Sequence, residues 1–169
     1  MIVRLAAVGA ACVVPVCAGC RDVASPAVAD LGLPVSAWVP DSAAVLGHDY
    51  YSGFATATHA VVSDGLTWAT TWTQFVGSLE PKPPAPSVDF AADRVLVVAL
   101  GTRSSGGYDI GIDSVVAFQS GTTVYLTGRS PGQRCFTTQA ITAPAQLVRV
   151  PLPPEPVTFQ ERDVVVDCP

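Results

Sequence analysis

Histidine and basic residues are scarce in this sequence, and their scarcity removes several classes of function. His48 and His59 are the only histidines, and neither belongs to a motif that pairs a nucleophile with its base. Nine basic residues stand against fourteen acidic ones, giving a formal charge of -5 at pH 7. Because neutralising a phosphate backbone requires a basic patch, nucleic acid is not an expected partner. We expect neither an enzyme nor a nucleic-acid binder.

The sequence also lacks an apolar run long enough to span a bilayer. The stretch from Leu5 to Val14 after Arg4 is shorter than the ~20 apolar residues of a transmembrane helix and has the layout of a secretory signal. Ala18 and Gly19 precede Cys20, as small residues do in the lipobox of bacterial lipoproteins. We therefore predict a signal peptide over 1–19 and lipid on Cys20. The alternative is an ordinary cleavage at Ala27-Val28-Ala29, which would release a soluble secreted protein.

Domain organisation and location follow from this cleavage site. Residues 20–45 carry prolines and no sustained periodicity, so they are expected to form a flexible tether, with one β-rich domain over 46–169. Asp22 does not follow Cys20 directly, so no strong inner-membrane retention signal is present. We expect an exported protein, lipid-anchored in a bacterial cell envelope, with a weak preference for the outer membrane or cell surface.

The remaining cysteines form a natural pair. The chain has five, of which Cys12 and Cys17 leave with the signal and Cys20 carries the lipid. Cys135 and Cys168 are then expected to form a disulfide, which an export compartment permits. Two cysteines with no histidine nearby make a poor metal site, so we predict no metal and no cofactor.

One segment has the periodicity of a helix. Four apolar side chains share the i, i+4, i+7, i+8 spacing of one helical face: Trp68, Trp72, Phe75 and Val76. Ser63 or Asp64 can cap the start of this helix, and Gly77 marks its end. The helix is expected to pack its apolar face on a sheet, although the two tryptophans could instead line a pocket.

Short runs rich in β-branched and aromatic residues predict six or seven strands. These runs cover 54–62, 94–100, 108–112, 122–127, 146–150 and 157–166. After Arg94, the 94–100 run is apolar through Leu100, as in a strand buried on both faces. This run is expected to form an antiparallel meander with the next two runs. A change of apolar phase predicts a bulge or corner near 160–163. The fold class is mainly β: an antiparallel β-sandwich or open barrel with one packed α-helix, borderline α+β.

A glycine-rich segment at 101–108 is the strongest candidate for a contact surface. It resembles the start of a phosphate-binding loop, but Gly107 and Tyr108 replace the lysine and hydroxyl residue, and a strand follows where a helix is needed. Arginine and tyrosine are favoured interface residues. The partner-binding loop is predicted to comprise Gly101, Arg103, Ser104, Gly106, Gly107 and Tyr108. The alternative is a glycine hairpin loop with no binding role.

Five segments in order resemble the PrcB C-terminal domain family. They are Trp68-x3-Trp72, Pro86 to Phe90, Val95 to Arg103, Gly106 to Ile112 and Ala140 to Pro144. The resemblance covers roughly residues 52–152. The family takes its name from a lipoprotein subunit associated with a secreted subtilisin-like protease complex. The resemblance therefore implies a cell-surface accessory domain without known catalysis.

Together these observations predict a membrane-anchored, non-catalytic module that binds another exported protein, with a secreted protease as one partner. The related inhibitor hypothesis has the 101–108 loop entering a protease cleft. A carrier or sensor of a small apolar ligand, with Trp68 and Trp72 lining its pocket, is the alternative from another class.

Overall fold

A computed structural model describes residues 32–77 and 79–168. The elements are β1 (Ser36–Trp38), β2 (Val45–Asp49), β3 (Thr58–Val62), α1 (Gly65–Phe75), β4 (Asp93–Ala99), β5 (Asp109–Phe118), β6 (Gly121–Pro131), β7 (Ala145–Pro151) and β8 (Val157–Val166). None of the helical residues among them forms a segment long and apolar enough to cross a membrane. The predicted signal peptide and Cys20 lie outside the described residues.

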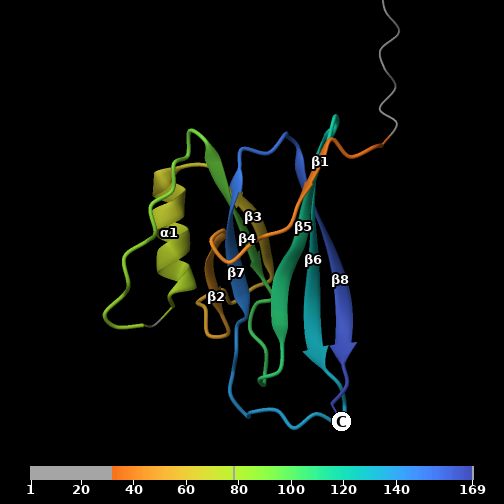
Figure 1. Cartoon of the computed structure of the whole chain (residues 1–169). Coiled ribbons are helices and arrows are strands. Elements are labelled where there is room, and N and C mark those ends of the chain that lie inside the picture. Colours follow the sequence, from red (N-terminus) through yellow and green to blue (C-terminus); the bar gives the residue numbers. More distant parts are fainter. Residues whose placement is uncertain (1–31, 78, 169) are drawn as a thin grey trace, which may run out of the picture.

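The strands form two open four-stranded sheets, with the helix as a third layer (Figure 1). The first sheet has the order β1-β5-β6-β8 and the second the order β2-β7-β4-β3. One apolar core fills the space between the sheets, and another lies between the second sheet and α1. The predicted sandwich with one packed helix is confirmed, in its open form rather than as a closed barrel.

Strand β4 is buried on both faces because it has a layer on either side. Leu96 and Val98 contribute to the core between the sheets, whereas Val95 and Val97 pack toward α1. The predicted meander is wrong, because β4 pairs with β3 and β7 while β5 belongs to the other sheet. An all-apolar strand needs cover on both sides, and a central place in the second sheet supplies it.

The helix follows its predicted signals. Asp64 is the N-cap, and its carboxylate accepts a 2.9 Å hydrogen bond from the Thr67 backbone N–H. This bond holds the pKa of Asp64 below its usual value. Trp68 and Phe75 are buried against the second sheet, and Val76 is the C-cap.

The first sheet departs from the expected antiparallel arrangement. Strand β8 pairs with β6 in parallel, because the chain crosses to the second sheet as β7 before it returns. The bulge expected near 160–163 is absent, since the register with β6 is continuous from Val157 to Val166. Glu161 and Asp163 continue the face of Val157 and Phe159, and their carboxylates lie over Gly128, but both residues are exposed. They lie on the edge strand of the sheet, where Glu161 reaches His59.

The fold begins before the expected boundary at residue 46. Strand β1 pairs with residues 115–117 of β5, and Ala44 is 7% exposed within the core between the sheets. The C-terminal part of the predicted tether is therefore part of the sandwich. A three-residue strand is too short to show an alternating pattern, which explains why the sequence did not reveal it.

Candidate functional site

The predicted partner-binding loop at 101–108 is joined to a second loop at 132–142. The Arg103 backbone N–H donates to the Thr142 carbonyl at 2.7 Å, and the Thr142 N–H donates back to Arg103 at 3.0 Å. The Gly106 N–H donates to the Thr138 carbonyl at 3.0 Å. We call these two segments the two-loop end. Figure 1 places the loop between β6 and β7 at the same end of the sandwich as the start of β5.

Glycine is required in the 101–108 segment because the second loop approaches its backbone closely. A Cβ on Gly106 would collide with the Thr138 hydroxyl, and one on Gly107 would lie 3.0 Å from the Thr137 methyl carbon. Gly107 also has φ +88°, a conformation that side chains disfavour. The alternative of a hairpin loop is wrong in its topology, because the segment connects β4 and β5 across the two sheets. These glycines therefore allow the 132–142 loop to pack closely on the 101–108 segment.

Several of the other residues in the predicted loop contact neighbouring protein groups. The Arg103 guanidinium lies 5.7 Å from the centre of the Tyr108 ring, in a cation–π arrangement, and both residues are half-buried. Gly101 is buried against the backbone of Thr56 and Ala57. Ser104 is exposed. The structure brings these residues together, with the arginine and tyrosine facing each other rather than pointing independently outward.

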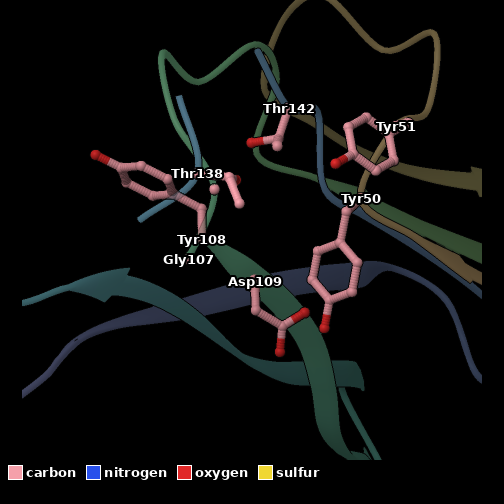
Figure 2. Close-up of a pocket in the computed structure, with 8 residues that line it drawn as sticks. Tyr50, Tyr51, Gly107, Tyr108, Asp109, Thr138 and Thr142 are labelled. Atoms are coloured by element: carbon pink, nitrogen blue, oxygen red, sulfur yellow. The ribbon is translucent and has the colours of Figure 1, made fainter. Parts of the chain in front are cut away.

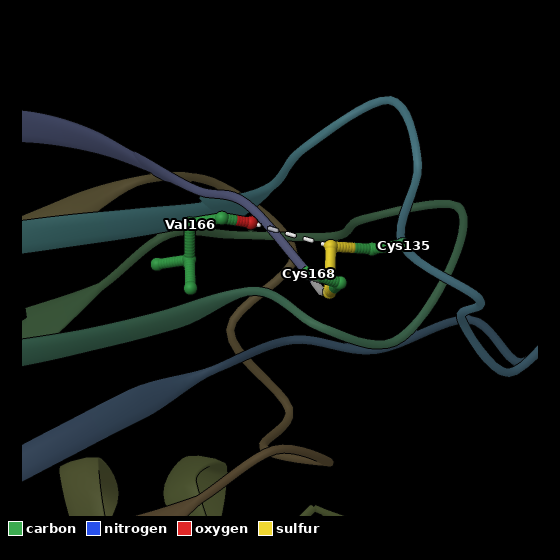
Figure 3. Close-up of a disulfide and its surroundings, with 3 residues drawn as sticks. All are labelled: Cys135, Val166 and Cys168. Carbon is green, nitrogen blue, oxygen red and sulfur yellow. Dashed lines mark hydrogen bonds between the residues drawn. A yellow bond between two sulfur atoms is a disulfide. The ribbon is translucent and has the colours of Figure 1, made fainter.

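The 132–142 loop is fixed by the predicted disulfide. Cys135 and Cys168 are bonded with their Cα atoms 5.0 Å apart, and Cys135 Sγ lies 3.3 Å from the Val166 carbonyl oxygen (Figure 3). The Gly132 N–H also donates to the Val166 carbonyl, at 2.9 Å. Directly after this anchor, Phe136 is 107% exposed, more than any other large apolar side chain in the described residues. Sequence reasoning found the cysteines but missed this phenylalanine.

A pocket of about 300 Å³ opens beside the two loops (Figure 2). It is lined by Tyr50, Tyr51, Gly106, Gly107, Tyr108, Asp109, Thr138 and Thr142. Figure 2 shows Tyr50 and Tyr51 on one side and the Tyr108 ring on the other, pointing away from them. The pocket therefore unites the predicted loop with residues from three other places in the chain.

Asp109 is the acidic residue that lines this pocket, and its carboxylate is hydrogen-bonded to two side chains. His48 Nε2 lies 2.7 Å from one carboxylate oxygen, and the Arg129 guanidinium donates to the other at 3.2 Å. The bond to Asp109 raises the pKa of His48, although burial opposes the shift. The same bond, helped by the charge of Arg129, lowers the pKa of Asp109. His48 and Asp109 are 61 positions apart in the sequence, so no local sequence pattern could predict their contact.

His59 bridges the sheets at the opposite edge. Its Nε2 lies 3.2 Å from a Glu161 oxygen, and its ring stacks on Phe159 with the centres 5.5 Å apart. His48 joins β2 to β5 in the same way, so each histidine links one edge of the second sheet to the first. In the described part of the chain, no histidine is hydrogen-bonded to a serine, threonine or cysteine side chain. The histidines support the architecture and display no nucleophile–base pair.

Trp68 and Trp72 attach the helix to the chain beside it. The Trp68 indole N–H donates to the Pro86 carbonyl and that of Trp72 to the Pro83 carbonyl, both at 2.8 Å. Both rings belong to the core between α1 and the second sheet. A different tryptophan, Trp38, lines an apolar groove of about 340 Å³ at the other end of the sandwich.

Within residues 32–77 and 79–168, no three histidine, cysteine or acidic side chains form a group that could hold a metal ion. Every buried side-chain nitrogen and oxygen in the same residues has a hydrogen-bond partner. The two-loop end and the adjoining pocket display an exposed apolar side chain, tyrosine rings and hydroxyl groups.

Comparison with known proteins identifies one segment of the chain. Residues 94–151 match the family model described as PrcB C-terminal. The matched segment extends from β4 to β7 and includes both loops of the two-loop end, whereas α1 and the tryptophans of the expected resemblance lie before it. No curated protein and no solved structure matches the chain.

Proposed function

Since residues 94–151 form a PrcB C-terminal family segment, we propose that the chain is an exported, membrane-anchored lipoprotein whose β-rich domain binds another exported protein without catalysing a reaction. The contact surface is the two-loop end. A secreted protease is the partner that fits the expected accessory role. The observation that carries the proposal is the full exposure of Phe136 on a loop fixed by a disulfide.

A fixed, protruding phenylalanine is an efficient binding anchor. Burying a phenylalanine side chain gains roughly 2–3 kcal/mol relative to leaving it in water. Cys135 is bonded to Cys168 on one side of Phe136, and the Thr138 carbonyl accepts from Gly106 on the other. The loop therefore loses little conformational freedom on binding, and preorganisation of this kind improves affinity. Ile141, 72% exposed on the same loop, extends the apolar surface.

The proposal can be tested by affinity capture from the native cell envelope after mild crosslinking. The tagged full chain is compared with Phe136→Ala and with Leu66→Ala, a control that removes another exposed apolar side chain, on α1. We expect one dominant exported protein with the wild type and the control, and its loss with Phe136→Ala. Equal recovery by all three chains would overturn the proposed surface.

The membrane anchor is tested by a separate variant. Cys20→Ala removes the only thiol that a cut after residue 19 would place at the mature N-terminus. We expect this variant to move from the membrane fraction to the soluble exported fraction while its domain stays folded. Retention in the membrane fraction would contradict lipid anchoring at Cys20.

A small apolar ligand remains a second candidate because of the groove beside Trp38. Its lining is mainly apolar and includes Val115, Val150 and Leu152. A ligand there would shift the fluorescence of Trp38, whereas Trp68 and Trp72 are already packed against the second sheet. A fatty acid or an aromatic compound that shifts the wild-type emission but not that of Trp38→Phe would favour this function.

A further inference from the structure

The pocket beside the two-loop end has a second set of binding features, separate from Phe136. The Asp49 carboxylate accepts a 2.6 Å hydrogen bond from the Tyr51 N–H, forming a turn directly after β2. Tyr51 then makes a bridge to Ala143. The chain bends where a continuing strand would send consecutive side chains to opposite faces. As a result, Tyr50 and Tyr51 both line one pocket (Figure 2).

The tyrosines offer both ring faces and hydroxyl groups to a ligand. Tyr50 is 48% exposed and Tyr51 63% exposed. Within the described residues, the hydroxyls of Tyr50, Tyr51 and Thr138 make no hydrogen bond to another protein group. Each hydroxyl can donate one hydrogen bond and accept others. The opposite wall includes the backbone of Gly106 and Gly107, where no side chain would keep a flat ligand away.

Asp109 supplies an oriented acceptor whose charge is already balanced. His48 and Arg129 hold the two carboxylate oxygens from the side of the sheet, at 2.7 and 3.2 Å. A cationic ligand would have to compete with both residues. An anionic group could form no hydrogen bond with the carboxylate, because both groups only accept. A purely apolar ligand would strip water from the carboxylate without replacing the hydrogen bonds. An uncharged ligand with several hydroxyl groups satisfies the pocket best.

From this geometry we infer that the pocket binds an uncharged pyranose ring of a carbohydrate. The weakly positive C–H face of the ring would lie on a tyrosine ring, whose π face is negative. Its hydroxyl groups would donate to Asp109 and exchange hydrogen bonds with Tyr50, Tyr51 and Thr138. The pocket volume of about 300 Å³ is suited to a single small ring rather than to a long ligand. This binding function is independent of the protein contact proposed for Phe136.

Saturation-transfer NMR on the full chain tests the inference directly. The probes are uncharged methyl pyranosides of glucose, galactose, mannose and N-acetylglucosamine, with choline, glucuronate and phenol as cationic, anionic and apolar comparisons. Methyl glycosides imitate a terminal unit of a glycan, and the corresponding free monosaccharides show whether the linkage matters. We expect saturation transfer to the ring protons of at least one pyranoside, and weaker transfer to the three comparison compounds.

Matched variants separate the pocket from the rest of the two-loop end. Tyr51→Ala should weaken pyranoside binding by about tenfold or more, as loss of an anchoring aromatic ring does. Tyr51→Phe keeps the ring face and should cause a smaller loss. Phe136→Ala should bind the pyranoside as the wild type does, because Phe136 does not line the pocket. Both tyrosine side chains are substantially exposed, so melting temperatures near that of the wild type are expected for these variants.

Three results would overturn the inference. The first is the absence of saturation transfer to any pyranoside with the folded wild type, and the second is unchanged binding by Tyr51→Ala together with Tyr50→Ala. Stronger binding of choline than of every pyranoside would assign the pocket to cations instead, which also contradicts the inference. None of these results affects capture of a protein through Phe136, so the two proposals fail separately.

Discussion

At the residue scale, the pair His48–Asp109 links β2, an edge strand of the second sheet, to β5 of the first sheet beside the pocket. The bond between them raises the pKa of His48 from its ordinary 6.5 and lowers that of Asp109 from its ordinary 3.8. A raised histidine pKa stabilises the fold below about 6.5 and loses this effect as the pH rises through the folded-state pKa. A lowered aspartate pKa stabilises above 3.8 and loses this effect as the pH falls. The pair therefore contributes most between these two values.

We predict that His48→Gln lowers the free energy of unfolding by up to ~1 kcal/mol near pH 5.5, since both side chains are partly exposed and screened by water. The loss should shrink as the pH rises through the raised pKa of His48, because the wild-type imidazole then becomes neutral. Urea unfolding at several pH values measures this effect, with Asp109→Asn and the double variant completing a cycle. A loss that is independent of pH would contradict the assigned pair.

Gly107 gives a second prediction at this scale. Its φ of +88° and the nearby Thr137 and Pro131 side chains leave no comfortable place for a Cβ. Gly107→Ala should therefore lower the free energy of unfolding by ~1–3 kcal/mol. Gly111→Ala is the matched control, because its Cβ would meet nothing closer than 3.7 Å. Equal melting temperatures for the two variants would show that the loop tolerates the change.

The sequence indicated which residues belong to the candidate site better than it indicated which residues contact one another. Arg103 and Tyr108 were chosen for their interface chemistry, yet they face each other, because the two-loop end folds the 101–108 segment back on itself. Phe136 has no periodicity around it that distinguishes an exposed phenylalanine from a buried one. The contact between Asp109 and His48 has no local sequence signal, because the histidine comes from another sheet.

At the scale of elements, the helix was the most predictable part. The 68–76 spacing, the cap at Asp64 and the stop at Gly77 are local signals, and the structure confirms each. Strand pairing was less predictable, because β4 and β5 follow one another in the chain and still enter different sheets. Burial of β4 on both faces was correctly predicted, but an apolar run does not reveal which neighbours cover it.

Helix packing gives a prediction with an internal control. Trp68 is 5% exposed and Leu66, on the same helix, is 82% exposed. Trp68→Ala should lower the free energy of unfolding by ~3–5 kcal/mol through the cavity that it leaves. Leu66→Ala should change it by less than about 0.5 kcal/mol. Denaturant unfolding monitored by circular dichroism distinguishes these values, and similar losses would mean that α1 does not pack as described.

The disulfide is the element that holds the 132–142 loop to the end of β8. It closes a loop with a sequence separation of 33 residues. Replacing Cys135 and Cys168 together by Ala should lower the free energy of unfolding by ~3–4 kcal/mol in the chain-entropy model. The freed loop should also be cut faster by chymotrypsin after Phe136. Cleavage at the wild-type rate would indicate that hydrogen bonds alone fix the loop.

At the scale of the whole molecule, the proposed binding groups lie at one end of the two-sheet sandwich. The 132–142 loop carries Phe136 and Ile141, and it packs on Gly106 and Gly107 of the 101–108 loop. The pocket of Tyr50 and Tyr51 opens beside them. The segment that matches the PrcB C-terminal family model, residues 94–151, includes both loops, so the matched part of the chain also carries the proposed contact surface.

The central claim is that Phe136 enters a partner protein. Placing a photo-crosslinking phenylalanine analogue at position 136 of the full chain, and at position 66 as a control, tests it in the native envelope. We expect one dominant crosslinked product from position 136 that is absent or much weaker from position 66. Indistinguishable patterns from the two positions, with the protein folded and abundant, would show that Phe136 does not enter a partner.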